Sequence, residues 1–198
     1  MDEMREKQEG IIDWFYGVIT RPVETLGEVA QARPVGWAFA VYLGTSLLGY
    51  FGSNTTYIPG ELGEGFLFFS MIVGLVISLA GIFVITGVVH LLSRLFNSGG
   101  GYWNLFSALG FAQFPALFLT PVGLISRLGG SAGAALGGLF SLGIWVWILV
   151  LNVIALRESH KLTTGQSILT YVLAIVLLSL IIIVPVVVIV ILVARMIT

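Results

Sequence analysis

The stretch 168–194 consists mostly of leucine, isoleucine and valine, and it limits the possible folds of this chain more than any other feature. A helix needs about 20 apolar residues to cross a hydrocarbon layer of about 30 Å. Inside that layer each crossing segment must satisfy its own backbone hydrogen bonds, as a helix does. Four further apolar stretches come before this one, at 35–51, 66–92, 105–125 and 134–156. The sequence therefore predicts an all-α, polytopic membrane protein with five transmembrane helices.

The composition agrees with a chain that is surrounded by lipid. Only 10% of the 198 residues are charged, whereas a soluble domain usually carries about 25%. Much of the surface must therefore be covered by a lipid bilayer. The net charge of −1 excludes the basic surface that a nucleic-acid partner requires. The absence of cysteine excludes disulfides and thiolate metal sites, and we expect no cofactor.

Lysine and arginine residues predict the orientation of the helices, because they are enriched in cytoplasmic segments. With the N-terminus in the cytoplasm, only Arg127 and Arg195 of the nine basic residues fall outside. We therefore expect a cytoplasmic N-terminus and an external C-terminus, in the cell membrane if the source is prokaryotic. The acidic start of the chain does not resemble a secretory signal. Residues 1–34 are expected to form a cytoplasmic segment ahead of a transmembrane domain at 35–198.

The N-terminal segment shows the periodicity of an amphipathic helix, with apolar residues at steps of four and three. Pro22 suits the first turn of a second helical piece, and Arg33-Pro34 ends that piece. Two interpretations fit equally: a broken helix that lies in the membrane interface, and a helix packed against the protein's own loops. The predicted apolar stripe consists of Ile12, Tyr16, Ile19, Val23, Leu26 and Ala30.

Proline residues interrupt the predicted helices at two places. Pro115 lies in the middle of the stretch 105–125 and Pro121 near its end, so we expect a kink or break there. Pro185 lies within the last stretch.

Small residues at four-residue spacing indicate where helices pack, because lipid gives helices no hydrophobic reason to associate. We expect a compact bundle of the first four helices, with the fifth at the periphery or at a subunit contact. The four stripes are Gly36-Ala40-Gly44, Ser70-Gly74-Ser78, Ala108-Ala112-Ala116 and Gly133-Gly137-Ser141.

Three stretches carry a family resemblance: 15–38 (FYGVITRPVETLGEVAQARPVGWA), 99–118 (GGGYWNLFSALGFAQFPALF) and 144–169 (IWVWILVLNVIALRESHKLTTGQSIL). They are similar to segments of the Yip family, the Ypt/Rab-interacting integral membrane proteins, in the form shared by bacteria and archaea. The resemblance implies five spans and a cytoplasmic N-terminus. Eukaryotic members act in vesicle traffic and bind small Rab-type GTPases and one another. Those members have a long cytoplasmic N-terminal region, whereas about 34 residues precede the first span here, which weakens the expectation of a GTPase partner.

The few polar residues in the apolar part of the chain are the candidates for a functional site. His90, His160, Glu158 and Glu24 are all expected at the cytoplasmic boundary, where imidazoles and carboxylates can bind a divalent metal or relay protons. No His-x-x-x-His or Glu-x-x-His spacing is present. Interfacial ion pairs and helix caps are therefore the favoured interpretation, and we predict no metal site.

Gln113 and Asn152 lie within predicted spans, where polar side chains join helices or mark a pathway. No acidic or basic residue lies deep in any span, which argues against an ion-coupled carrier.

The sequence favours a non-enzymatic membrane protein that acts through helix–helix contacts, either with itself as a homo-oligomer or with other membrane proteins. Its role would be in membrane organisation or in a process similar to membrane trafficking. The alternative is a small channel or transporter with a path near Gln113 and Asn152. A membrane enzyme with a metal at His90 and His160 is a third hypothesis.

Overall fold

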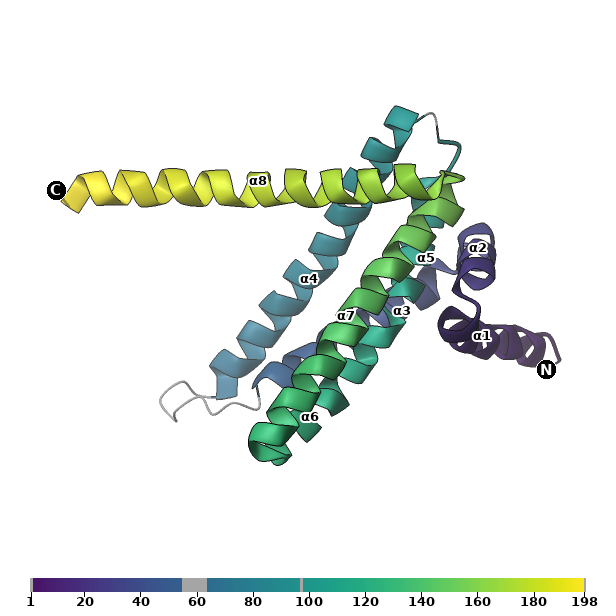
Figure 1. Ribbon diagram of the computed structural model, residues 1–198, viewed down its shortest axis with the longest axis horizontal. Helices are drawn as coiled ribbons and strands as arrows, with labels where there is room; N and C mark the ends of the chain where they lie inside the picture. The colour runs from purple at the N-terminus through teal and green to yellow at the C-terminus, as the bar shows by residue number, and fades with distance from the viewer. Residues whose placement is uncertain (1, 55–63, 97, 198) are drawn as a thin grey trace.

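The computed structural model describes residues 2–54, 64–96 and 98–197. Apart from short turns the chain is helical in these ranges, with no strand among them, so the all-α class is confirmed. Two short helices, α1 (Asp2–Thr20) and α2 (Pro22–Ala32), precede the bundle (Figure 1). The elements that follow are α3 (Val35–Asn54), α4 (Glu64–Ser93), η1 (Arg94–Phe96), α5 (Tyr102–Ala112), η2 (Phe114–Phe118), α6 (Leu119–Leu128), α7 (Gly130–His160) and α8 (Thr164–Ile197).

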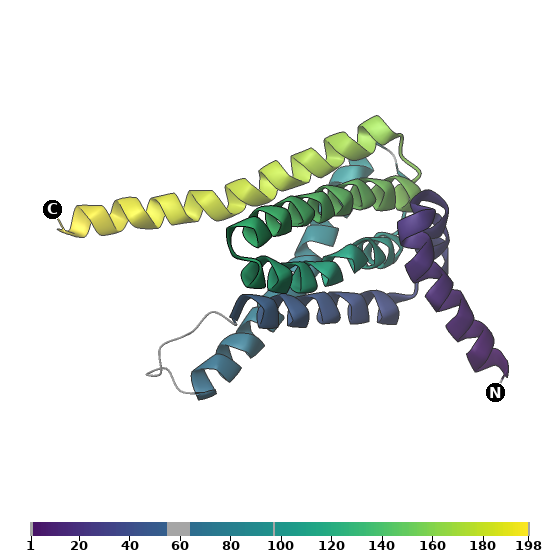
Figure 2. The same cartoon turned by 60° about the horizontal axis from the view of Figure 1, so that its bottom comes forward.

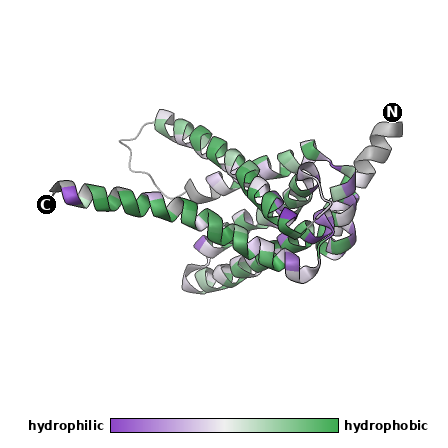
Figure 3. Ribbon diagram, turned by 90° about the horizontal axis from the view of Figure 1, so that it is seen from above, coloured by the Kyte–Doolittle hydropathy of each residue, from purple (hydrophilic) through white to green (hydrophobic). Residues whose placement is uncertain are grey.

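Four segments are long and apolar enough to cross a membrane: Phe68–Phe96, Tyr102–Leu128, Gly130–His160 and Thr164–Leu192. The apolar part of α3 that qualifies, Val35–Tyr50, is shorter. The predicted multi-pass fold is confirmed, and the predicted count of five is approximate because α3 falls below the length of the other four. Figure 3 shows that α8 is hydrophobic along most of its length, while hydrophilic residues gather at the end of the bundle near α2.

Proline residues set the corners between the first three helices. Pro22 occupies the first turn of α2, as predicted, and Arg21 is the N-cap residue. Arg33 ends α2 in the left-handed conformation, with φ of 52°, and its N–H donates to the carbonyl of Val29 at 3.0 Å. Pro34 follows, and α3 begins at the next residue. Each corner is therefore only one or two residues long.

The predicted stripe of the N-terminal segment divides between two surfaces. Leu26 and Ala30 of α2 are buried in the core. In α1 the residues that pack against the core lie outside the predicted stripe. One of them is Phe15, whose ring stacks on Phe111 with centroids 5.2 Å apart. The corner at Arg21 interrupts the helical periodicity, so one stripe cannot continue through both helices. Four stripe residues form an exposed apolar face instead, namely Ile12, Tyr16, Ile19 and Val23.

The helical segment that contains Pro115 is broken, as predicted. α5 ends at Ala112, the 3₁₀ segment η2 follows, and α6 resumes at Leu119. A proline lacks the N–H that would continue the α-helical hydrogen-bond ladder. Here the α-helical hydrogen bonds give way to the 3₁₀ pattern, in which the N–H of Ala116 donates to the carbonyl of Gln113, three residues earlier, at 2.9 Å.

The core lies where α2 packs across α5 and α7, at one end of the bundle. Figure 2 shows α3, the α5–α6 segment and α7 running side by side, with α1 and α2 across that end. The largest fully buried apolar side chains come mainly from these helices: Leu26, Leu105, Phe106, Phe111, Leu151 and Leu156.

Helix α8 contacts the rest of the bundle only near its start. Its packed face consists of Ser167, Thr170, Tyr171 and Ala174, which contact α4 and α7. After Leu178 every residue whose exposure is described is exposed. Pro185 lies inside the helix without ending it. Figures 1 and 2 show the C-terminal part of α8 extending away from the other helices.

Candidate functional site

The two histidines meet at the end of the bundle where α2 packs. His90 lies in the last turn of α4 and His160 is the last residue of α7. Their rings are joined by a hydrogen bond of 2.9 Å between Nδ1 of His90 and Nε2 of His160. His160 is fully buried. Two segments that are 70 residues apart in the chain are thus tied together by a pair of imidazoles.

One placement of the protons satisfies all the hydrogen bonds around this histidine pair. The hydroxyl of Ser159 donates to the carbonyl of Leu156 at 3.2 Å, and its oxygen accepts a hydrogen bond from Nδ1 of His160 at 3.0 Å. With this tautomer of neutral His160, Nε2 is unprotonated and accepts a hydrogen bond from Nδ1 of His90. The remaining nitrogen, Nε2 of His90, is left as a proton acceptor.

The glycine-rich turn before α5 closes over the pair. A Cβ atom at Gly100 would collide with the backbone carbonyl of Ser159 and would lie 2.7 Å from Cα of His160. Only glycine permits so close an approach of the turn. Tyr102, at the start of α5, places its ring edge-on to His90 with centroids 6.0 Å apart.

The two predicted carboxylates pair with arginines. Glu158 bonds Arg157 at 2.8 Å, and both side chains are about one-quarter exposed. Arg157 also donates to the hydroxyl of Thr164 at 3.3 Å, which joins α7 to α8. Glu24 lies 3.8 Å from Arg21 on the exposed surface. Among the described residues, no three histidine or acidic side chains converge in the way that a metal ion requires.

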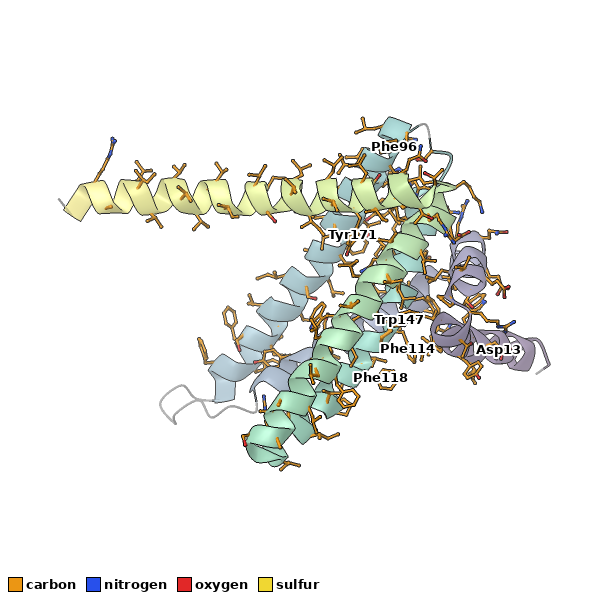
Figure 4. All side chains as sticks on the ribbon, in the orientation of Figure 1. Asp13, Phe96, Phe114, Phe118, Trp147 and Tyr171 are labelled. Carbon is orange, nitrogen blue, oxygen red and sulfur yellow. The ribbon has the colours of Figure 1, made fainter. Side chains whose placement is uncertain are left out.

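Gln113 and Asn152 also meet, and they extend to a third residue. The amide of Gln113 donates to Oδ1 of Asn152 at 3.3 Å, and Nδ2 of Asn152 donates to the hydroxyl of Tyr171 at 3.2 Å. This polar chain joins the break after α5 to α7 and α8, and Figure 4 shows Tyr171 near the start of α8. It borders a cavity of about 330 Å³ whose other walls are apolar. Those walls are Trp145, Val146, Ile148, Leu149 and Ile175.

The comparison with protein families is decisive at this point. The family model of the Yip1 domain matches residues 16–194, almost the whole chain. The chain belongs to the Yip1 family. The resemblance predicted from the sequence is thereby confirmed, and the protein is a multi-pass membrane protein of that family. No curated protein and no solved structure matches it.

Two small-residue stripes of this Yip1 domain lie inside the bundle. Ala108 and Ala112 are fully buried, and Ala116 is half-buried in the break that follows. Gly133 and Gly137 are buried against α6, where a Cβ atom at Gly137 would lie 2.5 Å from Cβ of Ser126. These residues let helices approach closely. Ser141, the last of its stripe, is half-buried.

The Ser70-Gly74-Ser78 stripe lies beside α3. Ser70 shares a hydrogen bond of 2.8 Å with the hydroxyl of Tyr50, and Ser78 shares one of 2.8 Å with Ser46. Gly74 lies between the two bonds on α4.

The Gly36-Ala40-Gly44 stripe lies on the outer face of α3. Gly36 and Ala40 are exposed and Gly44 is half-buried. The inner face of α3 carries Ala38, whose Cβ would lie 2.5 Å from a Cβ at Gly110. The sequence does not predict this contact, because Gly110 belongs to none of the four small-residue stripes.

Proposed function

We propose that this Yip1-family protein is non-enzymatic and acts by binding a second copy of itself, or another membrane protein, through its helices. The outer face of α3 carries the proposal. A Cβ atom added at Gly36 or Gly44 meets no other atom within 4 Å. Small residues four apart on a lipid-facing helix allow a second helix to approach to backbone contact.

Two further features support a contact role. Helix α8 has 34 residues, about 51 Å of helix at 1.5 Å per residue, and only its first turns pack on the bundle. In addition, the hydrogen bonds among Gln113, Asn152 and Tyr171 hold the break after α5, α7 and α8 together.

Replacing both Gly36 and Gly44 by leucine tests the proposal. We expect the double variant to dimerise about tenfold more weakly, which corresponds to roughly 1–2 kcal/mol for a tight helix contact. The measurement is dimer fraction in liposomes at graded protein-to-lipid ratios, by single-molecule photobleaching. Gly49→Leu is the matched control, because Gly49 lies on the same helix, also in open space, but outside the stripe. Equal dimerisation of both variants, or a wild type that stays monomeric and recovers no membrane partner, would count against the role.

The orientation is part of the same proposal: the N-terminus in the cytoplasm and the C-terminus outside. It is supported by the gathering of α2, the turn before α5 and the turn between α7 and α8 at one end of the bundle. Reporter tags fused to the two termini test it, and the same compartment for both tags would overturn it.

A small channel is the second candidate, and the cavity beside Gln113 and Asn152 is the observation that favours it. Flux of small polar solutes into liposomes would fall in Gln113→Leu and Asn152→Leu variants if the path passes there. Unchanged flux in both variants would exclude that path.

A further inference from the structure

An apolar groove of about 650 Å³ lies beside the broken helical segment. It runs between α7 and the segment η2–α6, and one end is closed by Ile19 of α1. Figure 4 shows Phe118 and Trp147, two of its lining residues, on this side of the molecule. Every lining side chain is apolar, so the groove offers no partner to a charged ligand.

The groove exists because of two local features of the sequence. The break at Pro115 turns the chain out of the α-helical path, and Pro115 and Phe118 become part of the wall. On the opposite wall Gly143 has no side chain, and a Cβ atom there would meet nothing within 4 Å. The space is therefore open at Gly143, and a larger residue would occupy it.

The length of the groove matches one leaflet of a bilayer. Its lining on α7 extends from Leu136 to Trp147, which lie about 16 Å apart along the helix axis at 1.5 Å per residue. Half of a hydrocarbon core of about 30 Å is about 15 Å. A single hydrocarbon chain from one leaflet would thus lie along the groove from end to end.

The end at Ile19 lies where a lipid headgroup would be. Ile19 belongs to the exposed apolar face of α1, and the corner after it carries exposed Thr20 and Arg21. An apolar helix face followed by polar residues is typical of the interface between hydrocarbon and headgroups. Arg21 and Glu24, an exposed ion pair at 3.8 Å, place one charge of each sign at that level, as a zwitterionic headgroup requires.

A second copy of the chain fits the groove less well than a lipid. The rim carries large exposed side chains, with Leu139 67% and Phe140 65% exposed. A helix with side chains is about 10 Å wide and needs small residues to approach closely. Two of the small residues nearby, Gly133 and Gly137, are already covered by α6, and the open ones, Gly138 and Gly143, stand beside the bulky exposed residues Leu139 and Leu142. A hydrocarbon chain is narrow enough to pass between the bulky rim residues.

We propose that this groove binds one acyl chain of a bilayer phospholipid, with the headgroup at the corner between α1 and α2. The site is independent of the contact face on α3, so it stands whether or not that face binds a partner.

The test uses the full chain in phosphatidylcholine vesicles that contain a small fraction of phosphatidylcholine with a photoactivatable acyl chain. After illumination, cross-linked peptides are mapped by mass spectrometry. We expect labelling to concentrate on η2 and on the segment 136–147, several-fold above that on the lipid-facing surfaces of α4 and α8. Even labelling over all exposed helices would show ordinary surrounding lipid and overturn the proposal, and so would protein–protein cross-links at the groove.

Gly143→Leu fills the groove, and Gly138→Leu is its control because Gly138 lies on the same helix in open space outside the groove. We expect Gly143→Leu to reduce labelling of 136–147 about tenfold, since losing contact with roughly two methylene groups has an effect of that size. Gly138→Leu should label like the wild type. Undiminished labelling in Gly143→Leu would overturn the site. The wild-type map decides the question alone if Gly143→Leu does not fold.

Discussion

The contact between Gly110 and Ala38 offers the sharpest test of the bundle. A Cβ atom at Gly110 would lie 2.5 Å from Cβ and 2.8 Å from Cα of Ala38, which is fully buried. Because ordinary contacts begin at about 3.4 Å, α3 would have to move away from α5 by roughly 1 Å. Overpacking of a core in this way costs about 1–3 kcal/mol.

Gly110→Ala should therefore lower the free energy of unfolding, even though alanine favours a helix over glycine by about 1 kcal/mol. Gly87→Ala isolates the steric effect, because Gly87 lies within α4 with no atom near its missing Cβ. We expect the two variants to differ by about 1–3 kcal/mol, with Gly87→Ala at or above the wild type.

The assay is reversible unfolding in bicelles, by steric trapping or by force, with helical content as a check on the folded state. Adding Ala38→Gly to Gly110→Ala removes the closest of the colliding atoms and should restore part of the loss. If Gly110→Ala is as stable as Gly87→Ala, then α3 and α5 do not meet at this point and the described packing is wrong.

Further variants test the turn over the histidine pair and the polar chain. Gly100→Ala places a Cβ atom against the backbone of Ser159 and His160 and should lower the free energy of unfolding by about 1–3 kcal/mol. Gly99→Ala is the control and should leave the free energy of unfolding unchanged, because a Cβ atom there lies in open space. Equal effects of the two variants would show that the turn does not close over the histidine pair. Tyr171→Phe removes the hydroxyl that Asn152 donates to and should cost about 0.6 kcal/mol, whereas Asn152→Leu should cost more because it breaks both bonds of the polar chain. Unfolding measurements that show no loss for Asn152→Leu would exclude a stabilising role for this chain.

The sequence predicts best those features that depend on neighbouring residues. Apolar runs of sufficient length identify the long helices, and the effect of proline on the backbone is local. For that reason the corner at Pro22 and the break at Pro115 lie where they were predicted.

Features that depend on which helix faces which are harder to predict. A four-residue spacing of small residues shows that a helix can be approached closely, but it does not say from which side. The stripes at Ala108 and Gly133 face inward, while Gly36 faces outward and Ala38 makes the inner contact. The hydrogen bond between His90 and His160 likewise depends on how α4 and α7 cross, which the positions of the two histidines in the sequence do not predict.

The corner between α2 and α3 has a consequence for any assembly. Arg33 and Pro34 form the whole connection, and the N–H of Val35 donates to the carbonyl of Arg33 at 2.7 Å, so α3 cannot swing freely relative to α2. Because α2 is packed against α5 and α7, the outer face of α3 points in a fixed direction relative to the bundle. Two copies related by a two-fold axis along α3 would hold their amphipathic helices in the same plane at a set separation. In such a pair the exposed apolar faces of the two α1 helices would lie at a fixed distance from each other.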